Sequence, residues 1–477
     1  MGALGRSTAR GVSLLVTRTL GFQLLTVGVT VVLARLLTPA DYGLFAIALS
    51  VQLVGQNVAE LGLPAALVRM SEEPSRELQA ATIGVLCVVT TTFSLALLAV
   101  AFLLVPAFGG DGELVRVIAV TLLALPLYAI RAVPMAMMDR GMSFGRVAAV
   151  EAADTIGFNA FALAAALLGL GVFSLAGAVP FGAVLGLGMA WTLQRAPRRP
   201  RLDLALVRPL VDFGSRVSAL GVLYLGRDLG FVAVIGAIGG APAAGFYAMA
   251  KRLFSFPTAL ASAVSRVTFP ALTKVSEERP QRAAQVVSQI ALVCGLPLAL
   301  VAGAIQPLIV VVLGDEWLPT TDIVLIGSLS MLLGASISSP INGLLLAEGR
   351  PNAAIAAIAA ELVAGFALVA ALIGPLEEAG IGIAMTAGTL LAVTILLATT
   401  EPAVRSGAWA VVRIGAISFL AALAGQLLPV DEDWVGLLLS LAAIAATWLV
   451  LSGIFARQEM GQVVRVIRAF LPGRGQA

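Results

Sequence analysis

The sequence contains no histidine and only two cysteines among its 477 residues. Without imidazole, it has no histidine metal ligands, no histidine proton relay and no Ser-His or Cys-His nucleophile pair. Cys87 and Cys294 lie in apolar stretches, where a thiol packs as a small hydrophobic group rather than forming a disulfide or a reactive site. We therefore predict that the protein is not an enzyme and has no catalytic residue, metal or cofactor.

Charged residues are also scarce, at 12% of the chain, whereas hydrophobic residues make up 59%. One soluble core of this length cannot enclose so much apolar surface, so lipid must be the solvent for most of it. The net charge of +3 is small and the basic residues are dispersed among loops, which argues against nucleic acid and favours membrane lipids as partners. The composition predicts an all-α polytopic membrane protein.

Apolar stretches of membrane-spanning length recur along the chain. A crossing requires roughly 20 residues, and about fourteen stretches satisfy this within the boundary error of sequence reading. The first has no small-residue cleavage site after Arg6 and Arg10, so we expect a retained helix rather than a signal peptide. The predicted helices lie near 11–36, 43–68, 80–106, 115–139, 147–169, 172–194, 210–236, 243–271, 284–313, 320–346, 352–374, 379–400, 409–428 and 434–456.

The loops between these stretches alternate in charge, and basic residues of membrane proteins are retained on the cytoplasmic side. One set of loops is basic and is predicted to be cytoplasmic: Arg69 and Arg76, Arg140 and Arg146, 195–208, Lys274 with Arg279 and Arg282, Arg350, Arg405, and the tail from Arg457. The other set is acidic and is predicted to lie outside: Asp41, Asp111 and Glu113, Asp315 and Glu316, Glu377 and Glu378, and 431–433. Only Arg35 and Arg116, near helix ends, break the pattern. Both termini are therefore predicted to be cytoplasmic.

The longest basic linker, 195–208, follows about six predicted crossings and suggests a boundary between two halves. We predict an N-terminal lobe at 1–194, the linker at 195–208, a C-terminal lobe at 209–400, an accessory helix pair within 401–456 and a basic tail at 457–477. Apolar residues of the tail recur at helical spacing with arginines between them. An interfacial amphipathic helix therefore fits the tail better than a disordered segment.

An internal repeat supports this division. The segment Tyr42-Gly43-Leu44-Phe45-Ala46-Ile47-Ala48 aligns without a gap on Ala244-Gly245-Phe246-Tyr247-Ala248-Met249-Ala250, and a proline, Pro39 or Pro242, lies shortly before each. An even number of crossings separates the copies, so we predict a parallel repeat of two six-helix lobes around a central cavity, followed by two C-terminal helices. Chance similarity between glycine- and alanine-rich helix starts is the alternative.

Several segments resemble a known family. These are 33–44 (LARLLTPADYGL), 138–144 (MDRGMSF), 244–250 (AGFYAMA), 267–272 (VTFPAL) and 346–351 (LAEGRP). In order and spacing, the sequence is similar to the polysaccharide transporter branch, the Wzx-type flippases, of the multidrug/oligosaccharidyl-lipid/polysaccharide exporter superfamily. The resemblance implies a flippase of the bacterial cytoplasmic (inner) membrane that moves a polyprenyl-pyrophosphate-linked oligosaccharide to the outer leaflet by alternating access, for surface polysaccharide synthesis. A polysaccharide polymerase and a chain-length regulator would be its partners.

Cations inside the predicted helices are candidates for substrate binding, because a charge in a membrane helix costs about 2.5–3.5 kcal/mol and usually faces a wet cavity or a partner. Arg227 and Lys251 are predicted at similar depths, roughly 12–15 Å inward. Such groups suit a pyrophosphate. The predicted set is Arg18, Arg227, Lys251, Arg252 and Arg266. The alternatives are pairing with a neighbouring carboxylate, as for Arg227, and side chains that extend to the headgroups, as for Lys251 and Arg252.

Embedded carboxylates are candidates for ion coupling, since protonation removes the cost of exposing a charge to hydrocarbon. We predict Glu60, Asp154 and Glu361 in this role and leave H⁺ and Na⁺ open as the ion. For Glu60 the alternative is a hydrogen bond with Gln56 or Asn57.

Two other functions remain as alternatives. A multidrug exporter of the same superfamily would share the fold, but we would expect anionic cavity residues for cationic drugs, and the seventh and eighth predicted helices are cationic. A membrane polysaccharide polymerase would need a soluble nucleotide-sugar domain or a large outer loop, and we find no loop longer than about fifteen residues.

Overall fold

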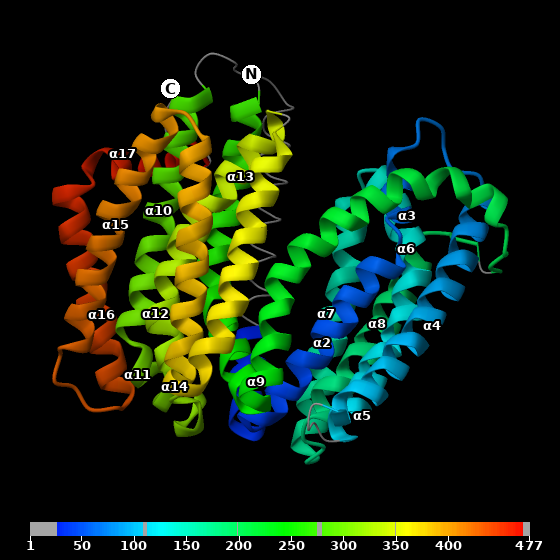
Figure 1. Cartoon of the computed structure of the whole chain (residues 1–477), viewed down its shortest axis with the longest axis horizontal. Helices are drawn as coiled ribbons and strands as arrows, with labels where there is room; N and C mark the ends of the chain where they lie inside the picture. Colours follow the sequence, from blue (N-terminus) through cyan, green and yellow to red (C-terminus); the bar gives the residue numbers. More distant parts are fainter. Residues whose placement is uncertain (1–25, 108–111, 198, 274–278, 349, 471–477) are drawn as a thin grey trace, which may run out of the picture. The chain divides into compact units, whose positions relative to one another are not determined.

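The computed structural model describes residues 26–107, 112–197, 199–273, 279–348 and 350–470 (Figure 1). The regular structure of these ranges is helical throughout, and eleven of their helices are long and apolar enough to cross a membrane. The predicted all-α polytopic fold class is therefore confirmed. The total of about fourteen crossings and the orientation stay predictions. Most of the predicted first helix lies outside the described residues, and its last part, Thr26–Leu36, is helical.

The chain forms two compact units. One unit is Thr26–Gly245, and the other contains the described residues from Phe246 onward. The division lies within α9 (Leu204–Thr273), in which two helices meet at a kink where Gly240 has φ 78° and ψ 178°. The sequence places the boundary between the two repeat lobes at the linker 195–208, and that boundary stays a prediction.

The Thr26–Gly245 unit is a bundle in which α7 packs closely against α8 and α4 packs against α6 (Figure 1). Its first long helix begins at a capping box: the hydroxyl of Thr38 accepts a hydrogen bond from the Asp41 amide (3.2 Å), and the Asp41 carboxylate accepts one from the Thr38 amide (2.9 Å). The helices of the unit before α9 are α2 (Pro39–Ala59), α3 (Leu63–Arg69), α4 (Arg76–Ala107), α5 (Gly112–Leu122), α6 (Ala124–Arg140), α7 (Phe144–Leu167) and α8 (Phe173–Leu193).

The prediction of one continuous helix at 43–68 is wrong. α2 ends at Ala59 with Glu60 as its C-cap, and α3 begins at Leu63. Leu61 (φ 50°) and Gly62 (φ 61°) both adopt the left-handed conformation between them. A left-handed glycine is a common helix terminator, and Pro64 fits the first turn of the next helix because its missing amide is not needed there.

The two glycines aligned by the internal repeat pack against each other in this unit. A Cβ added to Gly43 would lie 1.7 Å from the carbonyl oxygen of Ala241, and one added to Gly245 would lie 1.9 Å from that of Pro39. The repeat alignment pairs Pro39 with Ala241, so the contact is reciprocal. Small residues let helix backbones approach this closely. The aligned segments are therefore related in space as well as in sequence.

The unit from Phe246 onward is a helical bundle in which helices far apart in the sequence pack together. α10 packs against α15, and α12 packs against α14. α14 contains both predicted helices 352–374 and 379–400, because Glu377 (φ 48°, ψ −129°) interrupts it and its two halves pack together. The elements after α9 are α10 (Arg279–Gly303), α11 (Ile305–Leu308), η1 (Ile309–Leu313), η2 (Asp315–Trp317), α12 (Thr320–Leu333), η3 (Gly334–Ser338), α13 (Ser339–Ala347), α14 (Pro351–Thr399), α15 (Pro402–Gln426), α16 (Trp434–Phe455) and α17 (Arg457–Phe470).

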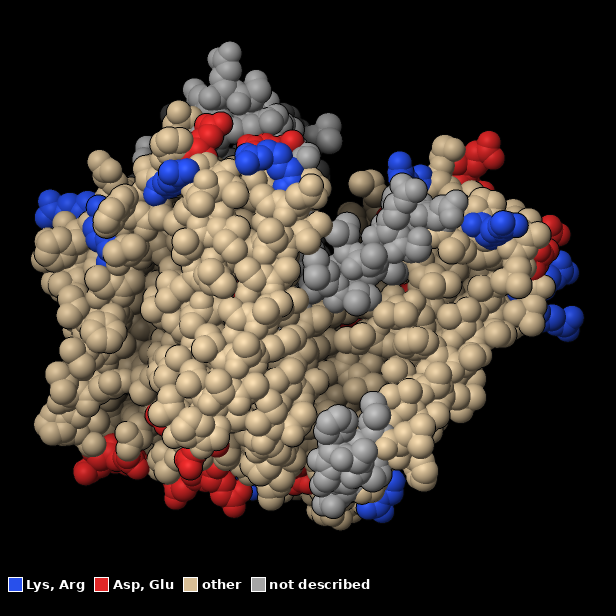
Figure 2. Space-filling view, in the orientation of Figure 1, with Lys and Arg blue, Asp and Glu red and all other residues tan. Residues whose placement is uncertain are grey.

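In this second unit one end of the helices is acidic, whereas arginines gather at the other end together with some acidic side chains (Figure 2). Acidic side chains gather where α15 and α16 are joined, and the middle of the face in view is almost free of charge (Figure 2). At the other end of α15, Arg350 donates to the carbonyl of Thr399 (2.8 Å), and Arg405 donates to those of Thr400 (3.1 Å) and Ala398 (3.2 Å). Two arginines of the basic loops thus satisfy the last carbonyls of α14.

The tail forms a helix, α17, in the range for which the sequence predicts an amphipathic helix. Glu459, which is only 7% exposed, forms an ion pair with Arg413 of α15. The side-chain amide of Gln289 on α10 also donates to that of Gln462 (3.4 Å). α17 is therefore attached to its own unit at two points, and its position at a membrane surface stays a prediction.

Substitution of either crossing glycine should destabilise the protein. Gly43→Ala and Gly245→Ala each place a methyl group against a backbone carbonyl, so the helices must separate, and we expect a cost of about 1–3 kcal/mol. Gly188→Ala on α8 is the matched control, because a Cβ there has no heavy atom within 4 Å. Thermal unfolding of the purified protein in detergent measures all three. Equal unfolding temperatures for the three variants would contradict the close crossing.

Candidate functional site

A chain of polar side chains follows α2 into the Thr26–Gly245 unit. The amide of Gln52, which is 1% exposed, donates to Gln56 (3.3 Å), whose own amide donates to the carboxylate of Glu60 (2.8 Å). Arg131 on α6 lies within electrostatic range of Glu60. The predicted candidate Glu60 thus lies at the C-cap of α2, at the end of a hydrogen-bonded series with a cation nearby. The alternative role considered for Glu60, a hydrogen bond with Gln56, is therefore present in the structure.

The predicted candidate Asp154 forms an ion pair with Arg131. Their side chains are only 21% and 17% exposed, and the guanidinium of Arg131 also lies 4.5 Å from the ring centroid of Tyr128. α8 leaves room for this pair, because a Cβ on Gly186 would lie 2.6 Å from the Arg131 guanidinium. A pair this deeply placed satisfies two charges that would otherwise be costly. In this conformation Asp154 is a paired carboxylate.

The predicted candidate Glu361 lies in a second cluster, within the unit from Phe246 onward. The hydroxyl of Thr389 donates to the Glu361 carboxylate (3.1 Å) and shares a hydrogen bond with the hydroxyl of Ser330 (2.8 Å). Ser330 and Thr389 are 4% and 3% exposed, whereas Glu361 is half-buried. The cluster joins α12 to both halves of α14. A carboxylate beside two hydroxyls presents the hard oxygen atoms that bind a proton or a small cation.

Further polar side chains lie close to this cluster in sequence, on an irregular stretch of helix. η3 (Gly334–Ser338) is a π-helical turn between α12 and α13, and such turns are frequent at functional sites. Among the described residues, Ser336 Oγ, Ser338 Oγ and Asn342 Oδ1 are buried without a hydrogen-bond partner. Buried polar atoms that lack a partner are uncommon and call for a ligand, a water molecule or a change of conformation.

The predicted cationic set is only partly described. Lys251 and Arg252 lie on α9 and are half-buried beside Ala250 and Phe254, which are each 1% exposed. Arg227 and Arg266 lie on the same element, but their side chains are outside the described residues, as is the whole of Arg18. The substrate-binding role of the five residues stays a prediction.

Sequence reasoning missed Arg131, Ser330 and Thr389. Arg131 had a usable signal, because it is a charge in the middle of the predicted helix 115–139. Ser330 and Thr389 had none, since serine and threonine in an apolar helix usually bond to the preceding turn of that helix. Their pairing depends on contact between helices far apart in the sequence.

These features define a polytopic helical membrane protein with polar groups held inside its bundles. The model of the family described as "Polysaccharide biosynthesis protein" matches residues 32–322, and the chain belongs to this family. In bacteria such a multi-pass helical protein is located in the inner membrane.

One curated relative is a transport protein. The chain is 26% identical over 305 residues to the succinoglycan biosynthesis transport protein ExoT of Rhizobium meliloti (strain 1021). The match covers 63% of this chain and 61% of the relative, so the chain spans less than two thirds of the length of that relative.

Two solved structures share the fold. The lipid II flippase MurJ, in an inward closed conformation, superposes with a TM-score of 0.77 at 14% identity and covers 94% of this chain and 99% of its own. An inward-facing multidrug resistance MATE family transporter of the MOP superfamily superposes with a TM-score of 0.53 at 15% identity, covering 83% and 94%. At these identities the likeness shows the fold.

Breaking the Arg131–Asp154 pair from one side should cost more than removing both charges. Arg131→Gln or Asp154→Asn leaves one poorly solvated charge without its partner, and we expect a loss of about 3–5 kcal/mol. The double variant should recover a large part of that loss. A double-mutant cycle of unfolding free energies in detergent measures the coupling. Additive losses in the double variant would show that the two groups do not act as a pair.

Proposed function

We propose that the protein is a flippase, not an enzyme, that moves a polyprenyl-pyrophosphate-linked oligosaccharide from the cytoplasmic to the outer leaflet for surface polysaccharide synthesis. The family match over residues 32–322 carries the proposal. The transport protein ExoT and the lipid II flippase MurJ support it by sequence and by fold respectively. The first name describes transport in succinoglycan biosynthesis, and the second describes a flippase for lipid II.

In the proposed mechanism, half-buried cations attract the anionic head of the substrate. Arg252 can bind phosphate oxygens through two parallel hydrogen bonds, and Lys251 adds a mobile point charge. Arg18, Arg227 and Arg266 are proposed to provide further cations along the route that the pyrophosphate follows through the protein. The charges hold the pyrophosphate while the apolar tail stays in lipid, and the protein alternates between inward-open and outward-open states.

Ion coupling is proposed to act through Glu361 rather than Asp154. Glu361 accepts a hydrogen bond from Thr389, and Thr389 also contacts Ser330, so we propose the oxygen atoms of these three side chains as the ligands for H⁺ or Na⁺. Asp154 is already neutralised by Arg131. Glu60 remains the second candidate, because its carboxylate lies within electrostatic range of Arg131 and accepts a hydrogen bond from Gln56.

The multidrug exporter is the second candidate function. The MATE transporter supports it, although with a TM-score of 0.53 against 0.77 for MurJ. The cationic Lys251 and Arg252 disfavour a pocket for cationic drugs because like charges repel. A membrane polymerase has less support, since the curated relative is a transport protein. The polymerase and the chain-length regulator are instead proposed as partners that receive the translocated glycan.

Translocation in a purified system tests the proposal. Vesicles with the reconstituted protein are loaded with a fluorescent polyprenyl-pyrophosphate oligosaccharide, and its accessibility to a membrane-impermeant quencher is followed over time. We expect faster exchange between leaflets than in protein-free vesicles. Exchange at the protein-free rate, with efflux of a cationic dye instead, would overturn the flippase in favour of the drug exporter.

The variant Lys251→Ala/Arg252→Ala tests substrate capture in the same vesicles. Loss of two charge-assisted contacts should slow exchange about ten- to a hundredfold. Arg199→Ala, in the exposed linker, is the control that removes a cation elsewhere and should leave the rate unchanged. Unchanged exchange in the double variant, at normal insertion, would exclude capture by this pair.

Neutralising Glu361 tests coupling separately from translocation. In Glu361→Gln the amide keeps the shape of the side chain but cannot gain or lose a charge, so we expect exchange that no longer responds to an imposed H⁺ or Na⁺ gradient. Exchange without a gradient should persist. Asp154→Asn provides the comparison, with gradient dependence retained in the folded fraction. A Glu361→Gln protein that still responds to both gradients would contradict the assignment.

A further inference from the structure

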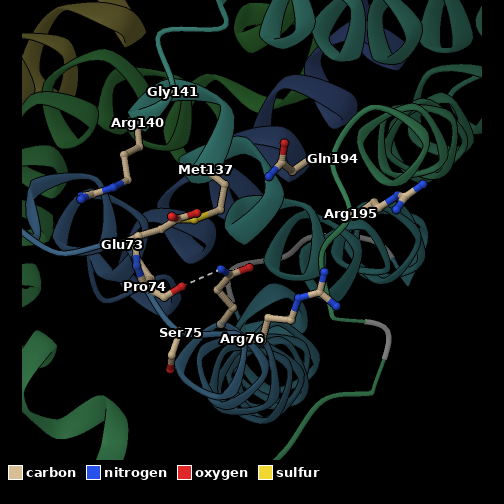
Figure 3. Close-up of a pocket in the computed structure, with 10 residues that line it drawn as sticks. Glu73, Pro74, Ser75, Arg76, Met137, Arg140, Gly141, Gln194 and Arg195 are labelled. Carbon is tan, nitrogen blue, oxygen red and sulfur yellow. Dashed lines mark hydrogen bonds between the residues drawn. The ribbon is translucent and has the colours of Figure 1, made fainter.

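A polar pocket opens on the basic-loop face of the Thr26–Gly245 unit, apart from the clusters described above (Figure 3). Its volume is about 750 Å³, within the range of small-molecule sites. The segment before α4, the first turns of α4, the end of α6 and the segment after α8 form its walls. The side chains that matter here are Glu73, Arg76, Gln79, Arg140, Gln194 and Arg195.

The lining of this pocket is strongly cationic. It contains three arginines and a single acidic residue, Glu73. In Figure 3, Arg140 and Glu73 lie on one side of the pocket, and Arg76 and Arg195 lie on the other. The amide side chains of Gln79 and Gln194 also belong to the lining. A hollow lined mainly by charge of one sign concentrates ions of the opposite sign, here anions.

Part of the pocket is a rigid frame. The guanidinium of Arg140 donates to the carbonyls of Val68 and Ser71 (both 3.2 Å) and to that of Met70, which ties the end of α6 to the end of α3. The side chain of Gln79, which is 9% exposed, donates to the carbonyl of Pro74 (2.9 Å). These bonds hold the walls in place before any ligand arrives.

The other two arginines are available to a ligand. Within the described part of the chain, Arg76 and Arg195 have no hydrogen-bond or ion-pair partner, and both are exposed. The segment after Arg195 is attached to α4, since the Arg201 amide donates to the Ala80 carbonyl (3.0 Å). Arg76 begins α4, whose N-terminal amides add further positive potential. Two cations without a partner in the described residues therefore line a pocket whose frame is fixed.

Exposed apolar side chains follow two of the lining segments in the sequence. Met142 and Phe144, next to the lining residue Gly141, are 74% and 53% exposed, and Leu202 and Leu204, beyond Arg195, are 71% and 72% exposed. Large apolar groups beside arginines at the end of a membrane bundle are typical of the zone where headgroups meet acyl chains. A ligand here can therefore place an anionic head in the pocket and an apolar chain beside it.

We propose that this pocket binds the phosphate-bearing headgroup of a lipid in the cytoplasmic leaflet, with Arg76 and Arg195 as the phosphate ligands. Arginine matches phosphate oxygens through two parallel hydrogen bonds. A membrane phospholipid and the polyprenyl-pyrophosphate carrier share this chemistry. If the lipid is the carrier, the pocket is its first docking site, and that reading alone rests on the proposed function.

Lipid binding by the purified full-length protein tests the site. Delipidated protein is titrated with phosphatidylglycerol, undecaprenyl pyrophosphate, inorganic pyrophosphate and the zwitterionic phosphatidylcholine, and bound species are counted by native mass spectrometry. We expect binding of at least one of the two anionic lipids, with phosphatidylcholine much weaker. Tighter binding of undecaprenyl pyrophosphate than of phosphatidylglycerol identifies the carrier, and the reverse order identifies a membrane lipid. Binding of inorganic pyrophosphate alone, or equal binding of phosphatidylcholine, would overturn a lipid headgroup site.

Matched variants separate the pocket from general surface charge. Arg76→Ala/Arg195→Ala should weaken anionic lipid binding about tenfold or more, and Arg76→Lys/Arg195→Lys should give an intermediate loss. Arg199→Ala/Arg208→Ala removes two exposed cations that do not line the pocket and should have little effect. All four positions are exposed, so the unfolding temperature should not change. Equal losses in the two alanine variants, or none in either, would refute the site.

The translocation assay distinguishes this proposal from the proposed function. Lipid binding that depends on Arg76 and Arg195 supports the pocket even in a protein that does not translocate the glycan. Active translocation with lipid binding unaffected by Arg76→Ala/Arg195→Ala would sink the pocket and leave the flippase standing.

Discussion

The cost of placing charge in hydrocarbon governs most of this structure. At about 2.5–3.5 kcal/mol for each charge in a membrane helix, charges either leave the span or find a partner within it. In the unit from Phe246 onward, Arg350 and Arg405 lie at the end of α14 and bind its last carbonyls, while acidic residues gather where α15 and α16 are joined. Inside the other unit, Arg131 lies against Asp154. The loops and the buried clusters follow the same rule.

The two polar clusters differ in the groups that contact their carboxylates. Arg131 and Asp154 neutralise each other, which suits a structural tie between α6 and α7. Glu361 accepts a hydrogen bond from the hydroxyl of Thr389, which also bonds to Ser330, and the π-helical turn η3 begins four residues after Ser330. Each cluster lies within one of the two compact units.

The sequence was sufficient for the fold class because hydropathy and loop charge report directly on the membrane. It also indicated Glu361 and Asp154, since a carboxylate in an apolar helix is conspicuous. It did not reveal their partners, because contact between distant helices leaves no local signal for Thr389 or Ser330. The break at Gly62 was missed because Leu61 and Gly62 also fit an apolar helix by composition. The repeat alignment, in contrast, already contained Gly43 and Gly245, whose reciprocal packing only the structure could show.

The sorting of charge across the bilayer is the central claim, and cysteine labelling tests it most directly. The two native cysteines lie in apolar helices and give a low background. Intact cells producing Ser71→Cys, Ser406→Cys, Gly112→Cys or Glu316→Cys are treated with a membrane-impermeant maleimide. The account predicts that Gly112→Cys and Glu316→Cys react at once and that Ser71→Cys and Ser406→Cys react only after the inner membrane is permeabilised. Labelling of all four from the same side, or in the opposite order, would contradict it.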